Sequence, residues 1–175
     1  MPSKKSSRRA ALSPLARSNC LIEVGASGVH GIGAFASQDL LAEQRVGVYE
    51  GRRLSAEDAA SLVCPSGLTY IFALSDGQVI DGSDGGNATR HINHSCAPNC
   101  IAWEEDAEDG SGSIVTVHAL RDITAGEELF LDYSLIVDAA DETSYGCYCR
   151  ARGCRGTMVG SSAQAKRHAL STHPI

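Results

Sequence analysis

The sequence predicts a mainly β fold of small sheets, with few and short helices, over roughly residues 20–157. Its apolar segments are short and rich in residues that favour strands. Glycine occurs 18 times, and turn sequences such as "DGG", "SDG" and "TAGE" separate the apolar segments. Only one segment begins with a convincing helix cap. A chain of 175 residues can hold one such domain with a core of its own, together with tails.

Eight segments along the chain are expected to form strands, and two to form helices. The strands are expected at 21–24, 32–36, 45–49, 68–74, 78–81, 101–103, 113–120 and 128–133. The clearer helix is expected at 55–62, because Ser55 can cap its first turn and acidic residues follow at the positive end of the helix dipole. A second, short helix is expected around 87–92. The sequence "DGSGS" at 109–113 predicts the tip of a hairpin.

The composition divides the chain into an arm, a body, an appendage and a tail. Residues 1–18 are basic and lack the apolar stretch of a secretory signal, so a flexible arm is expected there. The body is expected at 19–134, a cysteine-bearing appendage at 135–158 and a C-terminal tail at 159–175. No apolar run approaches the ~18 residues that a membrane helix needs, and no membrane partner is expected.

The charge of the chain is distributed unevenly. The arm carries five Lys and Arg residues and no acidic ones, so the formal net charge of −6 becomes −11 for the remainder. An acidic body repels the phosphates of nucleic acids and attracts basic ligands such as peptides rich in Lys and Arg. Solubility alone would explain the same charge equally well. Direct binding of nucleic acid by the body is therefore not expected.

The seven cysteines are clustered in a way that indicates a metal site. Without a secretion signal a reducing compartment is expected, where clustered cysteines commonly bind metal or take part in catalysis. The sequence "CYCRARGC" holds Cys147, Cys149 and Cys154, and three thiolates this close can occupy three corners of a zinc tetrahedron. The fourth ligand must come from elsewhere, and the candidates are Cys96, Cys100, His91 and His94. Four protein ligands would leave no position open for water, which indicates structural zinc.

The sequence "RHINHSCAPNC", which supplies these candidates, also allows other interpretations. Ser95 beside His94, with Asp81, could form a hydrolytic triad, but the chain has no G-x-S-x-G elbow. Cys96 or Cys100 paired with a histidine could act as a thiol nucleophile. The missing elbow disfavours the serine nucleophile. The zinc site competes for the same thiols, which disfavours the cysteine nucleophile.

Several weaker signals are ambiguous when each is taken alone. The G-x-G at 31–33 lacks the third glycine of a dinucleotide loop, so an ordinary turn explains it. Tyr133, which follows Asp132 at the end of an expected strand, is typical of a half-buried core tyrosine with its hydroxyl bonded. Cys20 and Cys64 belong to neither cysteine group and are expected to be buried structural thiols.

In their order along the chain, these pieces resemble the SET-domain protein lysine methyltransferases with a post-SET zinc motif. The resemblance runs from about residue 20 to 157. It includes the G-x-G, then "VYEGRRLS", "TYIFAL" and "VIDG" followed by "GNATRHINHSCAPNC", and it continues through "GEELFLDY" to "CYCRARGC". Each motif alone could arise by chance, whereas the ordered set is specific to this family.

The resemblance implies a SET-domain fold of the β-clip type, in which the Asn-His segment and the Asp-Tyr segment cross in a knot-like way. It implies S-adenosylmethionine as methyl donor, bound on one face, and a target lysine that enters through a narrow channel. Tyr133 would be the main catalytic residue and Tyr70 would line the channel. The cofactor would be bound by His30, Gly31, Ile32, Gly33, Arg90, Asn93, His94, Tyr133 and Tyr148. Structural Zn²⁺ would be held by Cys96, Cys147, Cys149 and Cys154.

The chain departs from the family pattern at a few positions. Two residues before the catalytic tyrosine the family usually has Phe or Tyr, a position that influences how many methyl groups are added, and here it is Leu131. Strand alternation places Leu131 on the face of Tyr133 and Phe130 on the opposite face. The smaller side chain favours di- or trimethylation. His91 stands where an aromatic usually follows Arg90, and no aromatic follows the last cysteine to close the channel.

The expected function is therefore protein lysine N-methylation of a basic protein tail, with histone as the leading candidate. The acidic sequences "EEDAED" and "DAADE" could face such a substrate or be solvated surface. The alternative is a SET-like, zinc-stabilised interaction module that has lost turnover. The compartment is the nucleus or a host-cell nucleus if the substrate is histone, and otherwise the cytoplasm. The sequence leaves the target lysine and the oligomeric state open.

Overall fold

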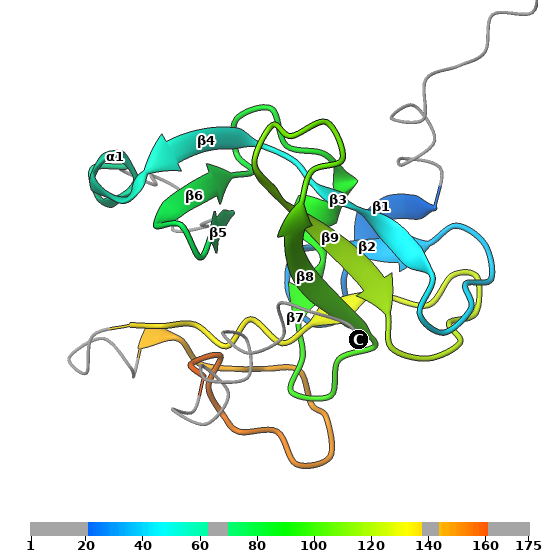
Figure 1. Cartoon of the computed structure of the whole chain (residues 1–175). Coiled ribbons are helices and arrows are strands. Elements are labelled where there is room, and N and C mark those ends of the chain that lie inside the picture. Colours follow the sequence, from blue (N-terminus) through cyan, green and yellow to red (C-terminus); the bar gives the residue numbers. More distant parts are fainter. Residues whose placement is uncertain (1–20, 63–69, 138–143, 161–175) are drawn as a thin grey trace, which may run out of the picture.

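The structure, a computed structural model, describes residues 21–62, 70–137 and 144–160. Within these ranges the chain forms ten strands, one α-helix and one 3-10 helix (Figure 1). The strands are β1 (Ile22–Ala26), β2 (Ile32–Ala36), β3 (Arg45–Tyr49), β4 (Arg52–Ser55), β5 (Ile71–Ala73), β6 (Gln78–Asp81), β7 (Asn93–His94), β8 (Cys100–Asp106), β9 (Ser113–Ala119) and β10 (Phe130–Leu131). The helices are α1 (Ala56–Ala60) and η2 (Ala88–His91).

The strands form four small sheets, which confirms the mainly β fold. Strands β1 and β2 form a hairpin, and β10 pairs with β7 in parallel. Two three-stranded antiparallel sheets have the orders β3-β9-β8 and β4-β6-β5. Figure 1 shows the β4-β6-β5 sheet on one side of the β3-β9-β8 sheet and the β1-β2 hairpin on the other.

Most of the expected elements are found. Strands β2, β3 and β6 have the predicted bounds, and the long hairpin of β8 and β9 turns at the predicted tip. Helix α1 begins after Ser55, whose hydroxyl accepts a hydrogen bond from the Asp58 backbone as the capping prediction requires. The strand expected at 128–133 is wrong in extent, because only β10 at 130–131 is regular. Strands β4 and β7 were not expected from the sequence.

The hydrophobic core lies under the β3-β9-β8 sheet and the β1-β2 hairpin. Its largest fully buried apolar side chains are Leu40, Ile92, Ile123, Leu129, Val46, Val115 and Val117. Cys100, at the start of β8, is 1% exposed and belongs to this core. The core cluster begins at Ile22 and ends at Leu131, so it takes no residue from 144–160.

Parts of the sequence-based interpretation fall outside the described ranges. These are the whole arm, most of the tail, Cys20, Cys64, the first residues of the strand expected at 68–74, and the acidic sequence at 138–142. In the part of the chain that the structure describes, no helix is long and apolar enough to cross a membrane.

Candidate active site

The site is built where two segments distant in sequence lie side by side. Strands β7 and β10 pair in parallel, with Phe130 opposite Asn93 and Leu131 opposite His94. The Ser95 backbone N–H donates to the Leu131 carbonyl at 2.9 Å and extends the pairing. The sequence "INHSC" and the sequence "LDY" therefore meet in one place, as the resemblance implied.

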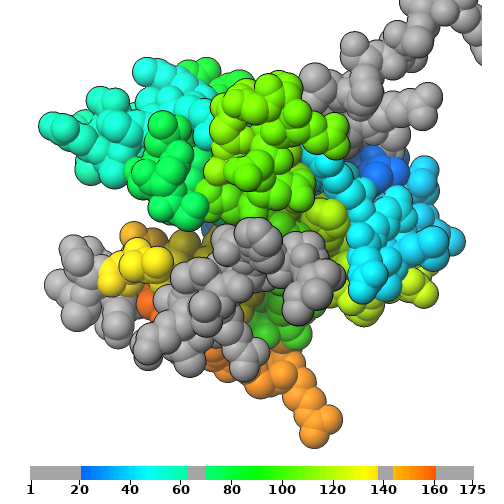
Figure 2. All heavy atoms as spheres, viewed as in Figure 1, coloured from blue at the N-terminus to red at the C-terminus, as the bar shows by residue number. Residues whose placement is uncertain are grey.

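A cavity of about 780 Å³ opens beside this crossing. Figure 2 shows the molecule hollowed between the β5 and β6 region, in green, and the segment after β10, in yellow and orange. Nine of the predicted catalytic and cofactor-binding residues line the cavity: His30, Gly31, Ile32, Tyr70, Arg90, Asn93, His94, Tyr133 and Tyr148. Gly33 is not part of the wall. A volume in this range is large enough for a small organic ligand.

Tyr133 combines a ring that faces the cavity with a fixed hydroxyl. The residue is 40% exposed, and its hydroxyl donates to the Ile92 carbonyl at 2.8 Å. Burial around the hydroxyl, together with the charge of a nearby Tyr70 phenolate, raises the pKa of Tyr133 to about 12. The hydroxyl is therefore neutral at physiological pH and can orient a ligand through its oxygen, but it is a poor proton acceptor.

His94 is buried behind Tyr133, and its ring connects two parts of the site. Its Nδ1 accepts a hydrogen bond from the Tyr133 backbone N–H at 3.1 Å, and its Nε2 lies 3.5 Å from the Cys96 sulfur. Burial lowers the pKa of His94, which favours the neutral ring. Since Nδ1 is the acceptor, the proton of the neutral ring lies on Nε2, directed at the sulfur. Both ring nitrogens are engaged within the chain.

Tyr70 is held at the cavity wall by three neighbours. The Arg90 guanidinium carbon lies 5.6 Å from the centre of the Tyr70 ring, a cation–π arrangement, and the His91 ring meets it edge-on at 5.9 Å. The Tyr49 hydroxyl donates to the Tyr70 backbone carbonyl at 2.7 Å. Burial raises the pKa of Tyr49 above its ordinary range, so this donor keeps its proton. Arg90 thus contacts the tyrosine expected to line the lysine channel.

Asn93 anchors the β1-β2 hairpin to the crossing. Its side-chain nitrogen lies within hydrogen-bond distance of the His30 carbonyl (3.2 Å), the Ile32 carbonyl (3.0 Å) and a Glu128 carboxylate oxygen (3.1 Å). Gly33 lies against the same carboxylate, because a Cβ atom added there would come within 2.3 Å of the Glu128 oxygen. The second glycine of the G-x-G therefore leaves room for the Glu128 carboxylate and does not line the cavity.

This packing predicts the effect of replacing Gly33 by alanine. The new methyl group would displace the Glu128 carboxylate and break its hydrogen bond to Asn93, at a cost of about 1 kcal/mol in the free energy of unfolding. Urea denaturation of the two proteins measures the difference. Gly28→Ala in the same hairpin is the matched control, because no heavy atom lies within 4 Å of a Cβ there. Equal losses in both variants would contradict the assignment.

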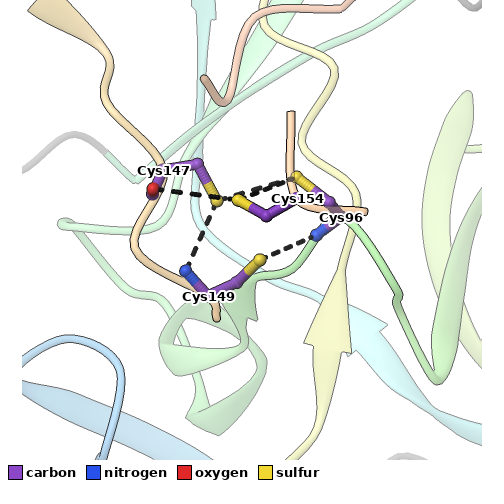
Figure 3. Close-up of side chains that lie close together, drawn as sticks. All are labelled: Cys96, Cys147, Cys149 and Cys154. Atoms are coloured by element: carbon purple, nitrogen blue, oxygen red, sulfur yellow. Dashed lines mark hydrogen bonds between the residues drawn. The ribbon is translucent and has the colours of Figure 1, made fainter. Parts of the chain in front are cut away.

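The four cysteines predicted to bind zinc come together. The sulfur atoms of Cys96, Cys147, Cys149 and Cys154 all lie within 4.8 Å of one another (Figure 3). The Cys96 sulfur is 3.7 Å from that of Cys147 and 3.9 Å from that of Cys154. Cys100, His91 and His94 are not members of this cluster. Of the four candidates for the fourth ligand, the structure therefore selects Cys96. Burial raises the pKa of Cys100 to about 12, as suits a structural thiol.

The cluster fits a tetrahedral zinc ion. With Zn–S bonds of about 2.3 Å, neighbouring sulfur atoms of a tetrahedron lie ~3.8 Å apart, close to the two shortest separations found here. Backbone N–H groups of Arg155 and Gly156 are each directed at a sulfur at 3.4 Å, as expected around thiolates. Although burial opposes it, hydrogen bonds from neighbouring backbone and thiol groups lower the pKa of Cys149 to about 6. Zinc would hold the appendage to β7 through Cys96.

Asp132 and Arg155 join the appendage to the crossing through a second link. The two Asp132 carboxylate oxygens accept hydrogen bonds from both terminal nitrogens of Arg155, each at 2.7 Å. Burial alone would raise the pKa of Asp132, but the Arg155 hydrogen bonds and positive charge hold it below its ordinary value. This pair connects the residue before Tyr133 with the residue after Cys154.

Sequence reasoning missed four residues of this arrangement: Tyr49, Glu128, Asp132 as an ion-pair partner, and Arg155. Tyr49, Glu128 and Asp132 stand within the family motifs "VYEGRRLS" and "GEELFLDY", so the motifs themselves were the available signal. Nothing in the spacing of Arg155 or Glu128 indicated their partners. The acidic residues 104–109 line no part of the cavity, and Glu104 instead accepts hydrogen bonds from Ser75.

Comparisons with known proteins agree with this architecture. The SET domain family matches residues 31–134, which is more than half of the chain. Over 137 residues the chain is 36% identical to a histone-lysine N-methyltransferase, H3 lysine-4 specific, of Candida albicans, and 33% identical to the protein of that description in Saccharomyces cerevisiae. Both alignments cover 75% of this chain, but only 13% and 12% of those longer proteins.

Solved structures give the same result. A chain of ctPRC2 in an autoinhibited conformation bound to S-adenosylmethionine aligns with a TM-score of 0.59 and 27% identity, over 66% of this chain and 15% of that one. A chain of an active polycomb repressive complex 2 in the stimulated state aligns with a TM-score of 0.60 and 26% identity, over 67% and 15%. The fold and the crossing define a SET domain. This chain belongs to the SET domain family.

Proposed function

We propose that the chain is an S-adenosylmethionine-dependent protein lysine N-methyltransferase that acts on a histone tail or another basic protein tail. The observation that carries the proposal is the meeting of Tyr133, Tyr70 and Asn93 at one cavity beside the β7–β10 crossing. Relatives named as histone H3 lysine-4 methyltransferases support the reaction and the substrate class. A similar solved chain that binds S-adenosylmethionine supports the cofactor.

The proposed cofactor side of the cavity is formed by the β1-β2 hairpin, β7 and the appendage. Residues 30–32 and Asn93 lie on one wall, and Tyr148, which is 74% exposed, presents an aromatic ring from the appendage. The ring nitrogens of His94 are engaged within the chain, so its backbone would face the cofactor. Gly33 would act indirectly, through the packing of the hairpin. Arg90 would act from the side of Tyr70.

The side chains at the other wall suit a lysine amine. S-adenosylmethionine supplies an electrophilic methyl group when bound, and the amine must be neutral to accept it. Tyr70, Tyr133 and Leu131 give an aromatic and apolar surface, and desolvation lowers the pKa of an amine from its free value near ~10.4. The neutral Tyr133 hydroxyl would orient the amine. Catalysis would come chiefly from positioning, for which no strong acid is required.

Zinc in the cysteine cluster would be structural. Four thiolates from the chain complete its tetrahedron, so the ion would stabilise the appendage that carries Tyr148. The place of action that follows from a histone substrate is the nucleus, either of the producing cell or of a host.

The direct test is methyl transfer from labelled S-adenosylmethionine to core histones and to a cell lysate, followed by mass spectrometry of the modified peptide. Peptides containing Lys4 of histone H3 are the first substrates to try, because the relatives are named for that lysine. We expect lysine-specific labelling that is lost in Tyr133→Phe. Binding of histone peptide without any transfer would instead favour the inactive interaction module.

Leu131 is expected to set the number of methyl groups added. It lines the cavity, whereas Phe130 does not, so the apolar side chain facing the amine is the smaller one. Leu131→Phe should fill the space that a second or third methyl group needs, and shift the product from di- or trimethyllysine to monomethyllysine. Mass spectrometry of the peptide at complete conversion measures this. Wild-type product that is monomethylated only would refute the role of Leu131.

A further inference from the structure

We propose that Arg155 is a positioning residue that makes the conformation of the Tyr133 segment depend on zinc in the cysteine cluster. Arg155 follows Cys154 directly, and it binds Asp132, which precedes Tyr133 directly. The consequence for catalysis rests on the proposed function. The dependence of the Tyr133 segment on the cysteine cluster is structural and can be measured without any methyl transfer.

The bond between Arg155 and Asp132 is geometrically demanding. Both terminal guanidinium nitrogens donate to the two carboxylate oxygens at 2.7 Å, so the pair fixes orientation as well as distance. The side chains are only 25% and 20% exposed, so water competes little with the interaction. A lysine at position 155 would keep the charge but lose the two-point contact.

Asp132 in turn holds an unfavourable backbone conformation just after Tyr133. Ser134 has a φ of 44°, in the left-handed region that residues other than glycine rarely adopt. One Asp132 carboxylate oxygen accepts hydrogen bonds from the Ser134 backbone N–H and hydroxyl, both at 3.1 Å. The same carboxylate therefore bonds Arg155 on one side and fixes the turn after Tyr133 on the other.

Arg155 is also attached to the cluster itself. Its backbone N–H is directed at the Cys96 sulfur at 3.4 Å, and its side-chain Nε is buried with no hydrogen-bond partner among the described residues. Four thiolates around one Zn²⁺ carry a net negative charge, which a guanidinium beside them offsets. When zinc leaves, the 144–160 segment loses its anchor to Cys96, and the Arg155 side chain is no longer held against Asp132.

The test follows the backbone amides of Tyr133 and Ser134 by NMR hydrogen exchange, with zinc bound and after addition of a chelator. In the wild-type protein we expect chelation to speed exchange at both amides by about tenfold or more. The Ser134 N–H bonds the Asp132 carboxylate directly, and the Tyr133 N–H, which bonds His94, lies between them in the chain. In Arg155→Gln the exchange should already be fast with zinc bound, and chelation should add little. The zinc content should stay at one ion per chain.

The controls separate positioning from folding and from function. Arg152→Gln is the matched control, because Arg152 lies in the same loop and is exposed, and it should behave as the wild type. Asp132→Asn removes the pair from the other side and should reproduce Arg155→Gln. In methyl transfer, Arg155→Gln should lower kcat by about tenfold and leave the KM for S-adenosylmethionine within about twofold, since only positioning is lost.

Two results would overturn the inference: wild-type exchange and chelator response in Arg155→Gln, or loss of zinc from that variant. If the wild-type protein is inactive but its amide exchange still depends on zinc, the proposed function is refuted and the link between the cluster and the Tyr133 segment is supported. Normal methyl transfer together with amide exchange that does not depend on zinc would support the proposed function and refute the link between the cluster and the Tyr133 segment.

Discussion

Replacing Tyr133 by phenylalanine should lower kcat for methyl transfer by about 10²-fold or more, while the Kd for S-adenosylmethionine changes by less than about twofold. The hydroxyl is the part of Tyr133 that can orient an amine, and loss of alignment of this order has effects of that size. The ring, which forms the cavity wall, is retained in the variant. Binding should therefore survive while turnover does not.

A radiolabelled methyl-transfer assay measures the rate, and calorimetric titration with S-adenosylmethionine measures the binding. The hydroxyl also donates to the Ile92 carbonyl, so the variant should lose about 1 kcal/mol of stability, and a thermal melt must show that it remains folded. Turnover close to that of the wild type would remove Tyr133 from the catalytic role. Weakened cofactor binding with normal kcat at saturation would make it a binding residue only.

Cys154→Ser should release zinc and unfold the appendage, and methyl transfer should fall by about tenfold or more as the cavity loses the wall that carries Tyr148. The reason is that residues 144–160 contribute no residue to the core. Apart from the cysteine cluster, they are held mainly by the Arg155–Asp132 ion pair and by an isolated bridge between Val159 and Leu135. The body, with its own core, should keep most of its cooperative unfolding transition.

Zinc content by mass spectrometry and limited proteolysis of the 144–160 segment test this directly. Cys100→Ala is the matched control, because Cys100 is a buried core thiol outside the cluster and its loss should leave one zinc ion bound. Serine is unsuitable there, since it would place a hydroxyl in the core. If Cys154→Ser binds zinc as tightly as the wild type, the assignment of Cys154 as a zinc ligand is wrong.

Local sequence patterns indicated the regular strands well, whereas the crossing was expected only from the family resemblance. Strands such as β2 and β3 follow from local patterns of apolar residues and turns. The segment 128–133 has the same local pattern, yet only residues 130 and 131 form a regular strand. Beside Glu128 and Phe130, the Asn99 side chain takes the place of a partner strand. That amide donates to the Glu128 carbonyl at 2.8 Å and accepts from the Phe130 backbone N–H at 2.7 Å. Strand propensity describes only the local sequence and cannot reveal a distant side chain as a partner.

The two unexpected strands have a related explanation. Strand β4 is charged and lacks alternation, and it exists because it pairs with β6, with Arg52 opposite Asp81. Strand β7 is two residues long and is defined only by its distant partner β10. Strands β4 and β7 both result from pairing with distant segments, which cannot be predicted from the local sequence pattern.

The same distinction applies to the site. The spacing of the last three cysteines predicted their joint role, and the ordered motifs predicted which thiol completes the set. The ion pair of Asp132 with Arg155 joins residues 23 positions apart and depends on how the appendage folds back. Local sequence reasoning has no means to find it.

The parallel pairing of β7 with β10 has a consequence for the order in which the molecule assembles. Parallel neighbours cannot be joined by a tight turn, and here the whole β8-β9 hairpin stands between them in the chain. The entropy of closing that loop must be offset before the pairing contributes anything. The hairpins should therefore form first and the crossing late. A chain emerging during synthesis would have most of its sheets before the β7–β10 crossing and the cavity beside it had formed.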